Sequence, residues 1–263
     1  MLKIALCVLV LASLSACHAP ERAEVSSVAP LGARSGHSFT YLDEEGARQT
    51  AVLAGIRGAE TPDSREQLQR LLDEAGPALM LIETEAGRDR YDRAVVLALF
   101  DRMEGEAYLD AEMVRSGQAM VWPRPGADER AHSLYALEAE ARLAAEGAWG
   151  SGDFAIRDPD PDRLAQTLDS AQIIEGRVVA VGEARNGRLY LNFGLNWRTD
   201  FTVSLNRADR ERFEAQGLSD PAELEGAVIR VRGWLYAENG PMIHVSSPAQ
   251  IEILDAPDPT PLP

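Results

Sequence analysis

The stretch Gly87-Arg88-Asp89-Arg90-Tyr91-Asp92-Arg93 runs directly into Ala94-Val95-Val96-Leu97-Ala98-Leu99-Phe100. A polar turn with three arginines is thus followed by an apolar run with the length of a buried strand. On either side, alternating and helical patterns of apolar residues predict further elements. We expect strands at residues 36–42, 49–56, 78–85 and 94–100, a helix from Thr61 to the stop signal Gly76-Pro77, and helices at residues 109–116 and 129–146.

Several separated motifs around this stretch agree in order and spacing with one known family. They are D-[KR]-Y-G-R at residues 89–93, N-x-x-[LM]-V-x-x-G-x-A at residues 110–119, and a final helix ending in G-x-W at residues 147–149. From about Arg34 to Gly150 the chain therefore resembles the thermonuclease (staphylococcal-nuclease-like) family. The resemblance implies an OB-like five-stranded barrel with three helices, and an active site that hydrolyses phosphodiester bonds with Ca²⁺.

A second set of strands follows in the C-terminal third of the chain. Alternating patterns and the turn signals Asn186-Gly187 and Asn239-Gly240 predict three strands, a short helix and two further strands between residues 174 and 245. Three strands, a helix and two strands is the OB order. The predicted fold class is therefore mainly β with helices (α+β): an OB-like five-stranded barrel with three helices, followed by a second small OB-like β-barrel.

Composition shifts divide the chain into six segments. A stiff, charged Asp-Pro repeat near residue 160 separates the two predicted barrels, and Pro-rich residues end the chain. We expect a signal peptide at residues 1–17, a flexible tether at 18–34, a thermonuclease-like domain at 35–150, a linker at 151–170, an OB-like domain at 171–254 and a disordered tail at 255–263.

The N-terminus resembles that of a bacterial lipoprotein. Lys3 precedes an apolar run that is too short to span a bilayer, and Leu14-Ser15-Ala16-Cys17 matches a lipobox. An ordinary signal peptide with an incidental cysteine is the alternative. We expect Cys17 to be lipidated and to anchor the chain in the bacterial cell envelope, at the periplasmic face of the outer membrane. Since Cys7 lies in the removed part, disulfides and cysteine-ligated metals are not expected.

The charge balance limits the partners. The formal net charge is −16, and Lys3 is the only lysine. Such an excess of negative charge repels polyanions, so nucleic acid is a disfavoured partner. The partner remains an unknown protein or small ligand, besides the membrane reached through Cys17.

The thermonuclease resemblance also locates a site, and most of its parts are altered. The family uses two metal-binding aspartates, a glutamate for the attacking water and two phosphate-binding arginines. When this pattern is placed on the chain, Glu60 matches the glutamate and Arg93 matches one of the arginines. His37 and Arg57 stand at the two aspartate positions, and Val52 stands at the position of the other arginine. Ca²⁺ prefers several hard oxygen ligands, so we expect no metal and no cofactor, with Ca²⁺ required only by an active nuclease.

These residues allow a structural and a functional interpretation. Arg57 with Glu60 is expected to form an ion pair in place of the metal, and Arg93 with Asp89 or Asp92 to stabilise a turn. The alternative is a residual phosphate-binding notch that contains Glu60, Arg93 and Arg57, because the planar guanidinium group suits phosphate.

The second module has a candidate surface of its own. Trp197 and Arg198 lie in a loop-like stretch with Asn192, and OB barrels bind ligands through aromatic and arginine side chains on their strands. The alternative is that Phe193, Trp197 and Phe201 all point into the core.

Three functions follow. The first is a lipid-anchored, thermonuclease-like envelope protein with a degenerate site, which binds and does not cleave. The second is an active phosphodiesterase that hydrolyses DNA or RNA through Glu60 and Arg93. The third is an envelope scaffold without a small ligand.

Overall fold

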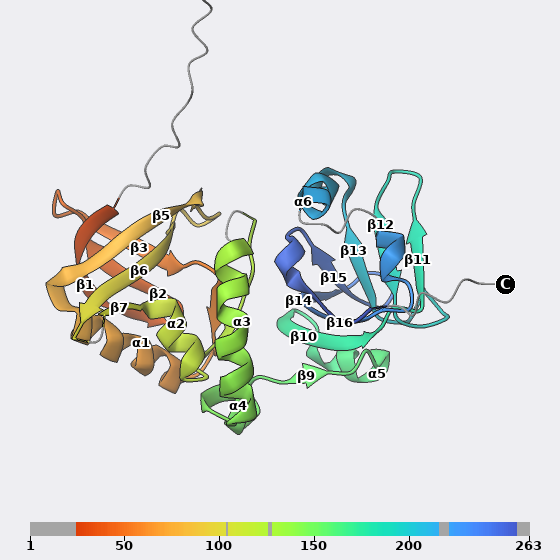
Figure 1. Ribbon diagram of the computed structural model, residues 1–263, viewed down its shortest axis with the longest axis horizontal. Coiled ribbons are helices and arrows are strands. Elements are labelled where there is room, and N and C mark those ends of the chain that lie inside the picture. Colours follow the sequence, from red (N-terminus) through yellow and green to blue (C-terminus); the bar gives the residue numbers. More distant parts are fainter. Residues whose placement is uncertain (1–24, 104, 126–127, 216–220, 257–263) are drawn as a thin grey trace, which may run out of the picture.

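The computed structural model describes residues 25–103, 105–125, 128–215 and 221–256. It contains two β-barrels, and the long helix α3 (Asp128–Leu143) stands between them (Figure 1). The first barrel is coloured red to yellow in the figure and the second cyan to blue. The expected fold class, an OB-like barrel with helices followed by a second small barrel, is confirmed.

The first barrel closes in the OB order. Antiparallel pairs join β3 to β2, β2 to β1, β1 to β5 and β5 to β6, and a parallel pair between β6 and β3 completes the circuit. A further strand, β7, extends the sheet beyond β6. The strands are β1 (Val25–Ser35), β2 (Ser38–Leu42), β3 (Arg48–Leu53), β5 (Leu79–Arg88), β6 (Ala94–Arg102) and β7 (Gly105–Tyr108).

One strand of this barrel differs from the sequence prediction. Residues 25–34, expected to belong to the flexible tether, form most of β1. The segment was missed because its apolar residues do not alternate regularly along the sequence, and Val28 is the only one of these ten residues that is buried. Its pairing with β2 on one side and β5 on the other supplies the backbone hydrogen bonds that hold it extended.

Helix α1 (Pro62–Ala75) follows the third barrel strand, as in the OB order, and packs its leucines into the barrel core. Thr61 caps its N-terminus by accepting a hydrogen bond from the backbone N–H of Ser64, and Gly76 ends it with φ of 54°. The remaining elements of this part are β4 (Ile56–Gly58), which pairs with β8 (Ala119–Val121), and the helices α2 (Leu109–Arg115) and α4 (Gly147–Ser151).

The second barrel repeats the same circuit. Its first strand is bent into β10 and β11, and the order β11-β12-β13-β15-β14-β10 returns to it. As in the first barrel, one neighbouring pair, β13 and β15, is parallel. The strands are β10 (Ser170–Arg177), β11 (Ala180–Glu183), β12 (Leu189–Asn192), β13 (Thr202–Leu205), β14 (Val228–Ala237) and β15 (Pro241–Val245); β16 (Ile251–Asp255) pairs with β14, and helix α6 (Arg210–Ala215) precedes β14.

The segment expected to be a plain linker carries short elements. These are β9 (Ile156–Arg157), which pairs in parallel with β10, and the single-turn helix α5 (Pro161–Leu164). Asp160 caps α5, and Pro161 occupies the first helical position, where its missing N–H costs nothing. The linker is therefore packed onto the second barrel.

A buried ion-pair network joins the two barrels. Arg232 of β14 is completely buried and donates hydrogen bonds of 2.9 Å to both carboxylate oxygens of Glu138 on α3. It also pairs with Glu252 and donates to the backbone oxygen of Val121 at 3.0 Å. Ala249 of the C-terminal part packs into the core of the first barrel. The two barrels therefore meet at a buried interface, although each has its own apolar core.

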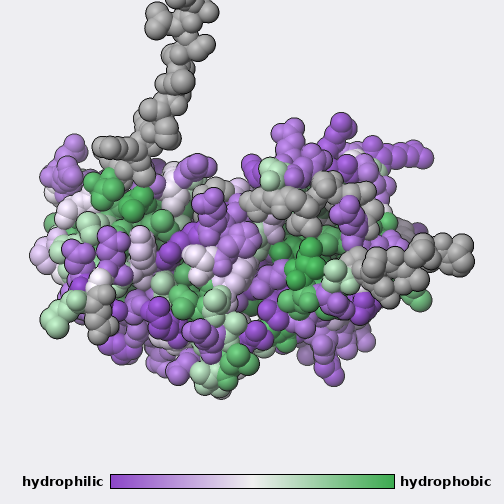
Figure 2. Space-filling model, viewed as in Figure 1, coloured by the Kyte–Doolittle hydropathy of each residue, from purple (hydrophilic) through white to green (hydrophobic). Residues whose placement is uncertain are grey.

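The face shown in Figure 2 is mostly hydrophilic, with smaller hydrophobic areas on both barrels. Within the described residues, none of the helices is both long and apolar enough to cross a membrane. The expected signal peptide with Cys17, residues 18–24 of the tether and residues 257–263 of the tail lie outside the described residues.

Candidate functional site

The two positions at which the resemblance implies metal-binding aspartates lie side by side. His37 is in the turn between β1 and β2, and Arg57 is in β4. The imidazole Nδ1 of His37 accepts a hydrogen bond of 3.3 Å from the backbone N–H of Gly58, the neighbour of Arg57. Burial lowers the pKa of His37 from 6.5 to about 3, helped by the positive charges of Arg57, Arg124 and Arg93. His37 is therefore an uncharged group in this site.

Arg57 is held on three sides. Its guanidinium Nη2 lies 2.6 Å from Oε1 of Glu60, which confirms the expected ion pair. The guanidinium carbon lies 5.7 Å from the ring centre of Trp122 and 5.4 Å from that of Trp234, within the range of cation–π contacts. Trp234 belongs to β14, so the second barrel contributes one of the two indole rings.

Glu60 and Arg93, the two residues that match the family pattern, both form ion pairs. The side chain of Glu60 is 81% exposed, and its carboxylate pairs with Arg57. Arg93 lies 2.6 Å from Asp89 in the turn before β6, and Asp89 also accepts hydrogen bonds from the backbone of Arg93 and Tyr91. The expected turn-stabilising pair is thus formed. Burial raises the pKa of Asp89, but these hydrogen bonds outweigh it and hold the pKa below its usual value.

A third arginine joins this group, and the sequence analysis did not single it out. Arg124 follows β8, and its pKa is lowered by burial and by the positive charges of Arg93 and Arg57. The ion pairs formed by the described residues include Arg57 and Arg93 but not Arg124. We call Arg57, Arg93 and Arg124 the arginine cluster. The charges of three guanidinium groups act on His37, whereas only two carboxylates, those of Glu60 and Asp89, are paired with them.

The residues at this site do not suit calcium. An imidazole and a guanidinium stand where carboxylates would be needed, and hard oxygen ligands are what Ca²⁺ prefers. Val52 is completely buried in a small apolar cluster with Ala54 and Val95, on the opposite face of β3 from the barrel core. Among the described residues, no group of three or more His, Cys, Asp or Glu side chains is placed to hold a metal ion.

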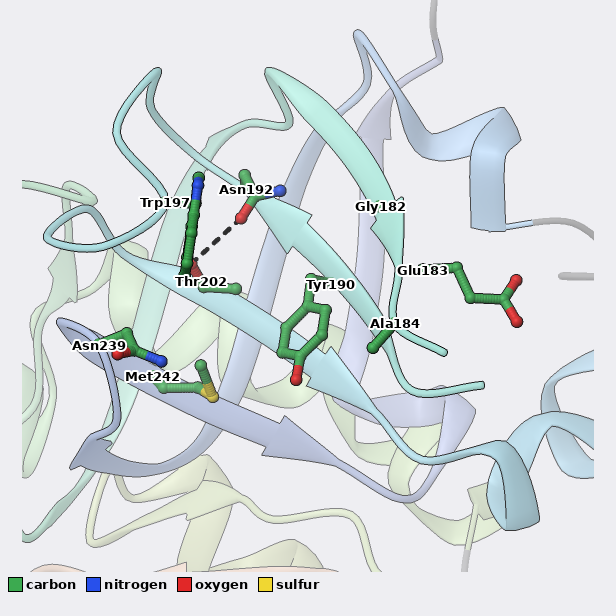
Figure 3. A pocket seen from close by; sticks show the side chains of 9 residues that line it. All are labelled: Gly182, Glu183, Ala184, Tyr190, Asn192, Trp197, Thr202, Asn239 and Met242. Atoms are coloured by element: carbon green, nitrogen blue, oxygen red, sulfur yellow. Dashed lines mark hydrogen bonds between the residues drawn. The ribbon is translucent and has the colours of Figure 1, made fainter. Parts of the chain in front are cut away.

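The second barrel contains a pocket of about 420 Å³. Trp197, a predicted binding residue, is 52% exposed and lines the pocket (Figure 3). The guanidinium of Arg198 lies 4.3 Å from the centre of the Trp197 indole ring. Phe193 and Phe201 are instead buried and pack on each other at 4.9 Å. The alternative in which all three aromatics enter the core is therefore right for the phenylalanines and wrong for Trp197.

No protein-family model and no curated protein matches this chain.

The OB-like fold of both barrels is thus established by their strand order, and any activity must be argued from the residues. The charges of Arg57 and Arg93 both lower the pKa of His37, and Glu60 is paired with Arg57. Trp197 and Arg198 form a separate group on the second barrel. Arg124 carried no sequence signal, because it lies between β8 and α3 and belongs to no motif with a recognisable spacing.

Proposed function

We propose that this chain is a thermonuclease-like binding protein of the bacterial cell envelope, whose first barrel holds an anionic group and does not cleave phosphodiester bonds. The observation that carries the proposal is the position of Arg57. Its guanidinium occupies the place of a metal-binding carboxylate, is paired with Glu60, and lies between Trp122 and Trp234.

Electrostatics argue against a cation at this position. A divalent ion would meet the positive charges of Arg57, Arg93 and Arg124, with the carboxylates of Glu60 and Asp89 already paired. Glu60 would also have to leave Arg57 before it could act on a water molecule. Removing a single electrostatic donor from an active site typically lowers the rate by about 10²–10³-fold, and here several parts of the family site are replaced together.

The same charges favour an anion. Arg57 and Arg93 are each balanced by one carboxylate, so Arg124 leaves an excess of positive charge within the arginine cluster. Guanidinium groups bind phosphate and carboxylate oxygens through pairs of hydrogen bonds. We therefore favour a small phosphate- or carboxylate-bearing ligand over a long polyanion, which the net charge of −16 would repel.

The test uses the purified full-length protein. Incubation with single-stranded DNA and RNA, with Ca²⁺ or with a chelator, should give no cleavage. Titration with inorganic phosphate at low salt should change tryptophan fluorescence, because Trp122 and Trp234 flank Arg57. Arg124→Gln should weaken that response, whereas Arg185→Gln, which removes an exposed arginine of the second barrel, should not.

Cleavage that disappears in a Glu60→Gln variant would refute the proposal in favour of an active phosphodiesterase. Cleavage that survives this substitution would point to a contaminating nuclease. No response to phosphate, together with no cleavage, would favour the envelope scaffold and remove the anion-binding part of the proposal.

The envelope location rests on the N-terminal sequence. A lipid on Cys17 would anchor the chain. Stable attachment to a membrane takes two signals, which two acyl chains on the same residue can supply. A Cys17→Ser variant is expected to move from the membrane fraction to the soluble fraction. If the parent protein fractionates as soluble, or the variant remains in the membrane fraction, Cys17 is not the anchor.

A further inference from the structure

The pocket of the second barrel lies where OB folds present a ligand surface. Its walls come from β11, β12, β13 and β15 and from the turn at Asn239, which joins the fourth and fifth strands of the barrel. In OB folds the second and third strands, with the loops between strands one and two and between four and five, contact oligonucleotides and oligosaccharides. At about 420 Å³, the pocket is within the size range of small-molecule sites.

Local hydrogen bonds and a neighbouring arginine hold Trp197 at the rim of this pocket. Its loop is closed by Asp200, whose carboxylate accepts a 2.8 Å hydrogen bond from the backbone N–H of Asn196. A further backbone bond of 2.9 Å joins Thr199 to Asn196. Arg198 lies against the indole, which limits its movement further. An aromatic ring fixed in this way loses little conformational entropy when a ligand packs on it.

The polar groups of the pocket are mostly uncharged. Asn192, Asn239, Thr202 and Tyr190 supply amide and hydroxyl groups, each of which can donate and accept hydrogen bonds (Figure 3). Thr202 donates to the Asn192 side chain at 3.4 Å, which holds that amide in place. Sugar hydroxyls need this mixture of donors and acceptors, and the apolar faces of sugar rings suit an indole platform.

The charges around the pocket argue against a nucleic acid. Among the described residues that line it, Glu183 is the one ionised side chain, and it pairs with Arg210 at 2.9 Å. Arg188, which lies 5.2 Å from the ring centre of Tyr190, is neutralised by Glu238 at 2.7 Å. A nucleic-acid backbone requires a row of cationic groups beside its phosphates.

We infer that this pocket binds a neutral oligosaccharide, with the Trp197 indole as the stacking platform and Asn192, Asn239 and Thr202 as hydrogen-bonding partners of its hydroxyl groups. The inference is independent of the arginine cluster on the first barrel.

The test titrates full-length protein, labelled with ¹⁵N, with three neutral trisaccharides: N-acetylglucosamine trimer, maltotriose and cellotriose. The chain has four tryptophans, so few indole N–H signals need to be assigned. At least one trisaccharide should shift the Trp197 signal in a saturable way. Trp197→Ala, whose binding is measured by isothermal titration calorimetry beside the parent protein, should bind about tenfold more weakly or worse, as expected for a central aromatic contact.

Matched variants separate binding from folding. Leu195→Ala removes a side chain of the Trp197 loop that is 95% exposed and does not line the pocket, and it should leave saccharide binding unchanged. Asn239→Gly, in an exposed turn where φ of this residue is 52°, should weaken binding without lowering the melting temperature, because glycine adopts this conformation freely. If no trisaccharide shifts Trp197 at millimolar concentration, the inference is wrong. It is equally wrong if an oligothymidylate shifts Trp197, with an affinity that falls as salt increases, and the saccharides do not.

Discussion

Arg57 illustrates how one residue changes what a site can hold. At the position where the thermonuclease resemblance implies a short carboxylate, the chain carries a long cation, which is neutralised by Glu60 and flanked by two indole rings. Its neighbour His37 is buried among arginines and stays uncharged. The cationic Arg57 and the uncharged His37 therefore do not supply the negative charge that a metal cation needs.

His37 should make stability depend on pH. The unfolded chain binds a proton at His37 below pH 6.5, whereas the folded chain does so only below about pH 3. The free energy of unfolding should therefore fall as the pH falls between these values, by up to about 1.4 kcal/mol per pH unit. Urea unfolding between pH 4 and pH 7 measures this slope.

In a folded His37→Gln variant that slope should be smaller. His132→Gln, which replaces an exposed histidine of α3, should keep the slope of the parent protein. Equal slopes in the parent and in His37→Gln would show that His37 is not buried in the neutral form.

At the scale of elements, the site depends on a close approach between two backbone segments. Gly58 of β4 packs against Gly36 in the turn between β1 and β2. A Cβ atom at Gly58 would lie 2.4 Å from the carbonyl carbon of Gly36, which is too close for any side chain. This contact brings His37 and Arg57 together, and pairing with β8 holds β4 in place.

Gly58→Ala should therefore push β4 away from the turn. We expect a loss of about 1–3 kcal/mol of stability, the usual cost of overpacking a tight contact. Gly182→Ala is the matched control, because a Cβ atom at Gly182 meets no atom within 4 Å. Urea unfolding of both variants measures the difference. A Gly58→Ala protein as stable as the parent would mean that β4 can shift freely.

At the scale of the whole molecule, the two barrels are connected by buried charge as well as by apolar contact. Arg232 from the second barrel and Glu138 from α3 are both buried, and Val121 of β8 hydrogen-bonds to both of them. Tyr135 of α3 donates a hydrogen bond to the backbone oxygen of Ala249. We therefore expect the barrels to unfold together.

Arg232→Ala would leave Glu138 buried without its partner. Breaking a buried pair in this way costs about 3–5 kcal/mol, which should lower the urea midpoint of the single transition. Arg163→Ala breaks an exposed pair with Asp160 and should cost less than about 1 kcal/mol. The double variant Arg232→Met, Glu138→Leu should be more stable than Arg232→Ala. If the first barrel keeps its own unchanged transition in Arg232→Ala, the barrels are independent.

Much of the fold could be predicted from local patterns. The apolar run at residues 94–100, the Thr61 and Gly76-Pro77 signals around α1, and the Asn-Gly turns of the second barrel all depend on neighbours in the sequence. The ion pairs Arg57–Glu60 and Arg93–Asp89 were predictable for the same reason, since each joins residues three or four positions apart.

The sequence by itself therefore determined most of the barrel strands and the larger helices, the OB-like class of both barrels and the local charge pairs. Only the tertiary structure decided that residues 25–34 form a strand, that Arg124 joins Arg57 and Arg93, that Trp234 covers Arg57, and that Arg232 is buried against Glu138. Local signals arise from backbone preferences and apolar spacing within a few residues. Contacts between distant segments depend on how the barrels close and pack, which no short stretch of the chain encodes.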